Sequence, residues 1–136
     1  MNEAEFKSRT KAVAVRVIKL ADALHRGRSG DALARQIIRS GTSIGANYRS
    51  ACRGRSVNDV ISRLGIVEDE ADETLFWMEV IVESGLLPAK RLTSLMDEVN
   101  QILAMTVASI RTMRAKASRN RANPKSKIQN PKSTYA

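Results

Sequence analysis

The sequence of 136 residues is poor in glycine, proline and aromatic side chains. Seven glycines and three prolines are too few for the many tight turns of an all-β domain. Aromatic residues make up only 4% of the chain, so a core must be built from aliphatic side chains and methionine. A chain of this length is expected to form one domain that buries its core without disulfides.

Long hydrophobic runs, cysteine pairs and histidine clusters are also missing. No stretch of about 18 apolar residues is present, and the first ten residues lack the apolar segment of a secretion signal. The single cysteine, Cys52, cannot form an internal disulfide, which suits a reducing compartment. We therefore expect a cytoplasmic protein that has no membrane partner.

No combination of side chains typical of an active site is found. Arginines flank Cys52 and could lower the pKa of its thiol, but no second cysteine or nearby histidine could assist it, so we interpret it as a half-buried structural residue. One cysteine and one histidine do not form a common zinc site. The acidic residues 68–73 lack the Glu-x-x-His pairs of di-metal bundles. The sequence predicts no enzymatic activity, no metal and no cofactor.

Positive charge dominates the chain, but it is unevenly distributed. The formal net charge is +9, made up of +8 over residues 1–56, −7 over residues 57–110 and +8 over residues 111–136. Such a pattern is typical of a protein that binds a polyanion or pairs its subunits through opposite charges. Neutralisation of acidic and basic helices within one bundle is a third possibility, although it leaves the surplus unexplained.

Apolar residues recur every three or four positions in four segments, which cover residues 5–25, 31–53, 57–84 and 88–117. Ser29 or Gly30 is expected to cap the second helix, Ser56 the third, and Gly85 is expected to end the third. Short connections between four amphipathic helices predict an all-α, up-down-up-down antiparallel four-helix bundle over residues 1–117. Residues 118–136 are basic and lack an apolar period, so we expect a disordered tail there.

Small residues cluster in the middle of the second segment, where Gly41 and Gly45 lie among serines, a threonine and alanine. Each glycine costs about 1 kcal/mol in a helix interior relative to alanine. We therefore expect another backbone to approach the second helix closely at this point.

Arginines gather on one side of the second helix. At about 100° per residue, Arg35, Arg39, Arg49 and Arg53 fall within one narrow arc opposite the apolar residues. Arginine binds phosphate through two hydrogen bonds and stacks on bases, so this arrangement favours a nucleic-acid partner. Pairing with carboxylates of another subunit and a plain solvated face remain open. The candidate nucleic-acid-binding set, here called the arginine ridge, comprises Arg28, Arg35, Arg39, Arg49, Arg53 and Arg55; the basic end of the fourth helix would support it.

A second face lies on the third helix, away from its apolar stripe. It contains Trp77, the only tryptophan, which is costly to expose without a partner. We interpret this face as an oligomer interface, although Trp77 could also lie flat on its own bundle. The predicted interface residues are Arg63, Ile66, Glu70, Glu73 and Trp77, with Ile81 on the same side.

Several segments together resemble a known family. They are Ile38-Arg-Ser-Gly-Thr-Ser-Ile-Gly-Ala-Asn47, Arg53-Gly-Arg-Ser56, Leu64-Gly-Ile-Val and Glu70-Ala-Asp-Glu-Thr74. Over residues 8–115 the chain is similar to four-helix bundle proteins once labelled ribosomal protein S23, which are encoded by intervening sequences within large-subunit ribosomal RNA genes. The residues that carry the pattern are Arg39, Ser43, Ile44, Asn47, Arg55, Ser56, Leu64 and Glu73. Tyr48-Arg49 departs from the more usual Ile-Ala and indicates a subgroup.

The resemblance implies a non-enzymatic bundle that assembles as a ring-shaped homopentamer. A related branch comprises basic pentamers that act as accessory proteins of diversity-generating retroelements and bind nucleic acid and a reverse transcriptase. It therefore implies RNA or DNA as a partner, and a reverse transcriptase or another RNA-handling protein as a second. A ring needs two different faces to meet, and the acidic third helix and the basic segments could supply them.

Overall fold

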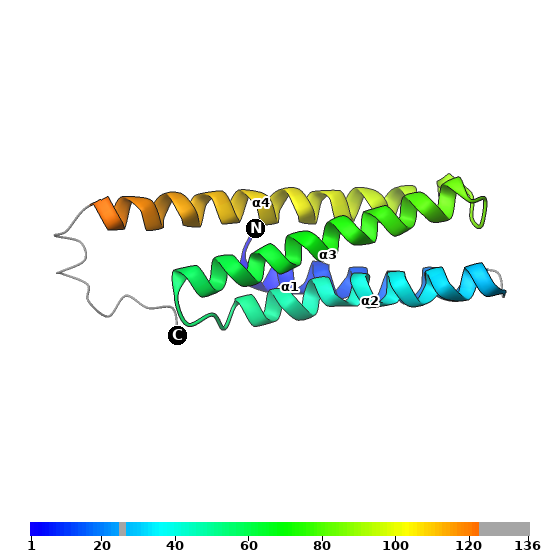
Figure 1. The fold of residues 1–136 in the computed structure, drawn as a ribbon, viewed down its shortest axis with the longest axis horizontal. Helices are drawn as coiled ribbons and strands as arrows, with labels where there is room; N and C mark the ends of the chain where they lie inside the picture. Colours follow the sequence, from blue (N-terminus) through cyan, green and yellow to red (C-terminus); the bar gives the residue numbers. More distant parts are fainter. Residues whose placement is uncertain (25–26, 123–136) are drawn as a thin grey trace.

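The computed structural model describes residues 1–24 and 27–122. These residues form four α-helices and one short 3₁₀ turn, arranged as an antiparallel bundle (Figure 1). The all-α, up-down-up-down architecture is thereby confirmed. The elements are α1 (Glu3–Asp22), α2 (Arg28–Ala51), α3 (Val57–Glu83), η1 (Ala89–Arg91) and α4 (Thr93–Ala122).

The first two helices begin earlier than the apolar pattern indicates. Helix α1 starts at Glu3 because the side chain of Asn2 accepts a hydrogen bond of 2.8 Å from the backbone N–H of Glu5. Helix α2 starts at Arg28, and its N-cap is Gly27 rather than Ser29 or Gly30. The backbone of Gly27 has φ of +147°, a conformation that glycine tolerates and other residues do not.

Both ends of α3 are formed as the sequence predicts. Ser56 accepts a hydrogen bond of 3.1 Å from the backbone N–H of Asp59, and the Asp59 carboxylate accepts one of 2.9 Å from the N–H of Arg55. At the other end Gly85 adopts φ of +79°, and the next residue, Leu86, donates its N–H back to the carbonyl of Ile81. These two caps fix the α2–α3 turn and the chain reversal into α4.

Helix α4 has the predicted length of 30 residues but lies five residues further along the chain. The expected start at residue 88 is wrong, because Pro88 precedes the short 3₁₀ turn η1 and the α-helix begins only at Thr93. It continues to Ala122, so residues 118–122, which we expected in the tail, are helical. Alanine, serine and arginine tolerate a helix, and the first proline after the core is Pro124, which disfavours helix in the residue before it. The remainder of the predicted tail, residues 123–136, lies outside the described residues.

Each helix packs against two neighbours around one aliphatic core. Helix α2 contacts α1 and α3, and α4 contacts α3 and α1, so α1 and α3 lie diagonally across the bundle. The core is built as the composition predicts, with one aromatic ring, Phe6, among aliphatic side chains. Its fully buried members include Val13, Val17, Ile37, Ile44, Val67, Met78, Ile81, Leu92, Val99 and Ile102.

The predicted close approach at the small residues of α2 is confirmed. A Cβ atom added to Gly41 would lie 2.7 Å from Cγ2 of Val17, and one added to Gly45 would lie 3.3 Å from the carbonyl carbon of Thr10. Both contacts are with α1. Because there is no room for a methyl group at Gly41, the helical cost of glycine is offset by dense packing between α1 and α2.

Polar side chains join α1 to α4 beside the core. Arg9 donates hydrogen bonds from Nε and Nη2 to the carboxylate of Glu98, and Nη2 also reaches Gln101. Arg16 donates to the hydroxyl of Ser94 at 2.9 Å. These contacts fix the axial register of α1 relative to α4.

We expect the Arg9–Glu98 pair to contribute pH-dependent stability. The hydrogen bond from Arg9 holds the pKa of Glu98 below its usual value near 4.5. A lowered folded-state pKa contributes stability above the unfolded pKa, and that contribution is lost as pH falls through the folded pKa. Glu98→Gln should therefore lower the free energy of unfolding by about 1 kcal/mol at pH 7. In urea denaturation the difference from the unmodified protein should shrink as pH falls well below 4.5; an equal loss at all pH values would contradict the assignment.

Candidate nucleic-acid interface

Helix α2 presents the arginine ridge to solvent. Its apolar residues, among them Ile37 and Ile44, are fully buried against the rest of the core. Because the helix turns by about 100° per residue, the opposite side projects outward. All six residues of the ridge, in α2 and in the turn that follows it, are exposed. The helical spacing therefore placed these side chains correctly, and their binding role stays a prediction.

One arginine of the ridge is held by acidic residues of its own chain. Arg39 Nη1 lies 3.3 Å from a carboxylate oxygen of Glu70, and Nη2 bonds the carboxylate of Glu73. These contacts join α2 to α3. The ridge is consequently divided into an Arg28–Arg35 part and an Arg49–Arg55 part, separated by about 21 Å at a rise of 1.5 Å per residue.

The predicted oligomer interface on α3 mostly contacts α2 of the same chain. Arg63 pairs with Asp59 at 3.1 Å and bonds the hydroxyl of Ser50 on α2. Glu70 and Glu73 pair with Arg39, as described above. The sequence left open that these carboxylates pair with arginines of another subunit. For Arg39, the pairing is made inside one chain. Spacing on α3 identified one side of the helix but could not tell which neighbour it meets.

The hydrophobic members of that predicted interface differ in exposure. Trp77 is half-buried against the core, and its Nε1 donates a 3.1 Å hydrogen bond to Glu73. Ile81 is fully buried, so its assignment to the outer face is wrong. Ile66 is 43% exposed. The packed side of α3 is wide because the helix contacts both α2 and α4, and this width brings Ile81 inside.

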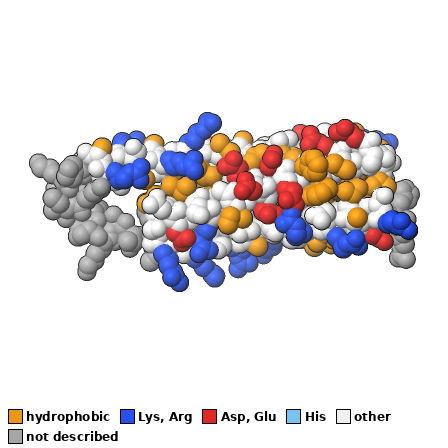
Figure 2. Space-filling model, in the orientation of Figure 1, with side chains coloured by type: hydrophobic (Ala, Val, Ile, Leu, Met, Phe, Trp, Pro, Cys, Tyr) orange, Lys and Arg blue, Asp and Glu red, His pale blue; other side chains and the backbone are white. Residues whose placement is uncertain are grey.

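Charge is segregated along the axis of the bundle. The contacts of Gly45 with Thr10 and of Arg9 with Gln101 align the helices in register. A plane across the bundle at these aligned residues divides the described residues into two halves. Residues 1–10, 45–68 and 100–122 carry eleven Lys/Arg and four Asp/Glu, whereas residues 11–24, 27–44 and 69–99 carry eight and ten. In the view of Figure 2 most of the acidic side chains lie away from the end where α4 projects. We call the first half, which contains the α2–α3 turn, the basic end.

Helix α4 adds its own positive charge to the basic end. Its last core contacts there come from Ile110 and Met113, which pack with Ala51 and Leu64. Beyond Met113 the helix continues past the α2–α3 turn, for about 14 Å at 1.5 Å per residue (Figure 1). Its exposed cations are Arg111, Arg114, Lys116, Arg119 and Arg121. Arg53 and Arg55 extend the same positive region at the α2–α3 turn.

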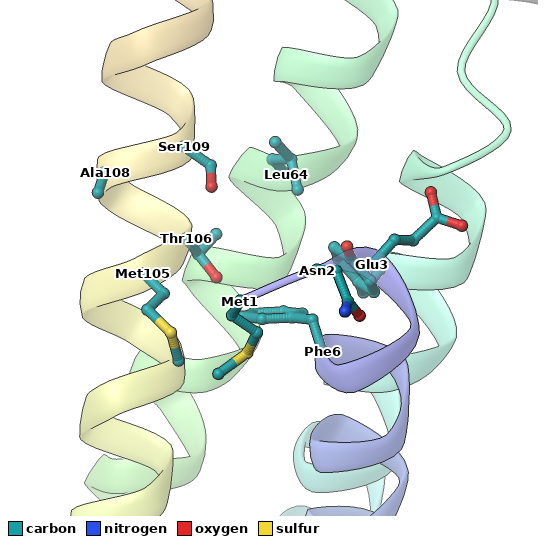
Figure 3. Close-up of a pocket in the computed structure, with 10 residues that line it drawn as sticks. Met1, Asn2, Glu3, Phe6, Leu64, Met105, Thr106, Ala108 and Ser109 are labelled. Atoms are coloured by element: carbon teal, nitrogen blue, oxygen red, sulfur yellow. The ribbon is translucent and has the colours of Figure 1, made fainter.

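A cavity of about 250 Å³ opens at this end between the start of α1 and α4 (Figure 3). Phe6 and Met105 line it together with Tyr48, whose ring centroid lies 4.4 Å from that of Phe6. Cys52 lies nearby, and burial raises the pKa of its thiol. A raised pKa leaves the thiol protonated near neutral pH, so flanking arginines do not activate it.

Within residues 1–24 and 27–122, no three His, Cys, Asp or Glu side chains are close enough together to hold a metal ion. None of the helices in this part of the chain combines the length and the apolar character needed to cross a membrane.

The exposed hydrophobic residues on α1 and α3 were missed by the sequence reasoning. Val15 and Ile18 are 47% and 43% exposed, and Phe76 is 53% exposed. A signal was available, because Val15 and Ile18 fall outside the stripe formed by Phe6, Val13 and Val17. It was overlooked because single exposed hydrophobic residues are common on protein surfaces.

Comparisons with known proteins confirm the resemblance. Residues 2–108 match the family model of the 23S rRNA-intervening sequence protein. A solved structure from Bacteroides thetaiotaomicron, a protein of unknown function from the S23 ribosomal protein family, is 31% identical with a TM-score of 0.73; the match covers 77% of this chain and 97% of that one. A search of curated proteins found no match. A family model that spans most of an antiparallel helical bundle, together with a solved relative of the same fold, places this chain in the family of 23S rRNA-intervening sequence proteins.

Proposed function

We propose that this protein is a non-enzymatic, cytoplasmic homo-oligomer that binds nucleic acid, RNA in the first place, through its basic end. The observation that carries the proposal is the axial segregation of charge, with eleven cations and four anions in one half of the described residues. Five of these cations lie in the last turns of α4, four of them beyond Met113, and three lie at the end of α2 and its turn. Two separate elements thus offer guanidinium and ammonium groups to a backbone lying across them.

The mechanism is neutralisation of phosphates with release of counterions, which requires no base-specific contact. Arginine suits this role because its planar guanidinium donates two parallel hydrogen bonds to a phosphate. Arg49, Arg53 and Arg55 remain central to the proposed site. Arg28 and Arg35 are left out of the proposed site because they lie in the opposite half of the bundle, and Arg39 because its guanidinium already pairs with Glu70 and Glu73.

Assembly into a ring would strengthen this binding. We propose a homopentamer, in keeping with what the family resemblance implies, so that several basic ends face one nucleic acid. Once one basic end has bound, the others meet the same nucleic acid at a high effective concentration, so the weak contacts together give a higher affinity. An RNA-handling protein, such as a reverse transcriptase, is the proposed second partner. The family description supports a connection with ribosomal RNA genes.

The test is fluorescence anisotropy with labelled single-stranded RNA and hairpin RNA, using nuclease-treated protein. We expect binding that weakens linearly on a log–log plot between about 50 and 200 mM salt, with a slope near −0.7 for each phosphate contact on a single strand. Several contacts should give a slope of about −3 or steeper. The absence of binding at the lowest salt concentration would refute the proposal.

A structural oligomer or protein-interaction scaffold is the second candidate. It is favoured by one observation, namely that Arg39 is already used to join helices rather than left free. In that case the assembly forms, but RNA does not bind at any salt concentration.

A further inference from the structure

Within the described residues, the exposed large hydrophobic side chains lie on only two helices, apart from Met1 at the chain start. Val15 and Ile18 lie on α1, and they are 47% and 43% exposed. Ile66 and Phe76 lie on α3, with 43% and 53% exposed. Four half-exposed side chains of this size in two groups suggest surfaces that become covered.

The two groups lie on opposite sides of the molecule. Helices α1 and α3 are diagonal in the bundle, because each packs against α2 and α4. Their outward faces therefore point away from each other. A surface on one cannot cover the surface on the other within the same chain.

The surface on α3 is acidic. Asp69, Asp72, Glu79 and Glu83 surround Phe76 on the exposed side of the helix. No salt bridge within residues 1–24 and 27–122 engages these four carboxylates. A hollow beside Phe76 is lined by Glu79, Val80 and Glu83. In Figure 2 acidic and hydrophobic side chains lie together over this half of the molecule. We call this the acidic face.

The surface on α1 is bordered by cations. Lys11 and Lys19 are exposed on α1 near Val15 and Ile18, and Arg35 is exposed on the adjacent α2. In the described part of the chain these three cations take part in no salt bridge. Asp22 lies at the end of the same stripe. We call this surface, on α1 and the neighbouring edge of α2, the cationic face.

We infer that the acidic face of one copy docks against the cationic face of a second copy. Phe76 and Ile66 would cover Val15 and Ile18, while the bordering carboxylates meet Lys11, Lys19 and Arg35. The inference rests on the self-association in the proposed function and names the surfaces that achieve it. It replaces the predicted interface on the α2 side of α3, whose polar groups are already paired within the chain.

Contact between two different faces is heterologous, so after the first contact the pair of copies keeps one free acidic face and one free cationic face. Growth continues until the ring closes. Helix α1 is about 30 Å long. A contact of that length and about two helix diameters in width covers about 600 Å² on each partner. That area reaches the lower end of specific protein interfaces, about 1,200 Å² in total.

Two single variants test the docking without disturbing the core. Phe76→Lys disrupts the acidic face by placing a cation opposite the cations of the partner, Val15→Asp disrupts the cationic face by placing a carboxylate opposite carboxylates, and both residues are half-exposed. Light scattering after size exclusion should give 15.0 kDa for each variant alone. An equal mixture should form a species of about 30 kDa, twice the 15.0 kDa of one chain and no larger, because one intact face of each kind remains. The matched control is Ala108→Asp on exposed α4, which should keep the mass of the unmodified oligomer.

Each other outcome overturns the inference. These outcomes are a variant that retains the oligomer mass, a mixture that stays at 15.0 kDa, and an unmodified protein that is monomeric. Circular dichroism confirms that each variant is folded, and Ile18→Asp serves as a second cationic-face variant. RNA anisotropy on the unmodified protein separates the two proposals. A monomeric protein that binds RNA would refute only the docking, and an oligomer that binds no RNA would refute only the nucleic-acid binding.

Discussion

Reversal of three charges at the basic end should weaken RNA binding by roughly a hundredfold to a thousandfold in low salt. The variant combines Arg53→Glu and Arg55→Glu in the α2–α3 turn region with Arg114→Glu on α4. All three side chains are exposed, and none belongs to a salt bridge among the described residues. Loss of three phosphate contacts should also flatten the log–log salt slope by about 2 for a single strand. Anisotropy across the salt series measures both quantities.

The matched control reverses three charges at the opposite end of the bundle, namely Arg28→Glu, Lys90→Glu and Arg91→Glu. It has the same net charge as the first variant, so a general electrostatic effect would appear equally in both. At about 0.15 M salt, where both variants are compared, we expect the control to lose less than about tenfold in affinity, because a Debye length of about 8 Å screens charges at the far end of the bundle. Equal losses in the two variants would contradict the localisation of binding to the basic end.

Substitution of Gly41 by leucine should lower the free energy of unfolding by about 3 kcal/mol or more, and the melting temperature by about 10 °C. A Cβ atom at this position would already lie 2.7 Å from Cγ2 of Val17, whose side chain is fully buried. The larger side chain has to force α1 and α2 apart, which breaks the packing of both helices. Thermal unfolding followed by circular dichroism measures the effect.

Gly65 provides the comparison. It lies inside α3, and an added Cβ atom would meet nothing within 4 Å. Gly65→Ala should therefore raise the free energy of unfolding by about 1 kcal/mol through helix propensity alone. If Gly41→Leu melted at the same temperature as the unmodified protein, the close α1–α2 packing described here would be wrong.

The local features of the fold were predictable from sequence because they depend on neighbouring residues. The three- and four-residue apolar spacing predicted four helices, and Ser56 and Gly85 marked the ends of α3 correctly. The glycines of α2 predicted a close neighbour, although not that the neighbour is α1. Helix ends set by Asn2 and Gly27 were missed, because a cap outside the apolar period leaves no trace in that period.

The candidate site was predictable only in part. Spacing alone placed the arginine ridge on the solvent side of α2, since one helix determines which of its residues share a face. Only the tertiary structure decided that Arg39 pairs with Glu70 and Glu73, because that contact joins residues about thirty positions apart. Axial register between the helices likewise brought the end of α2 and the projection of α4 into one basic end. The sequence by itself determined the helices, their faces and the charge each carries; the packing of one helix against another determined which charges are neutralised and which remain free to bind.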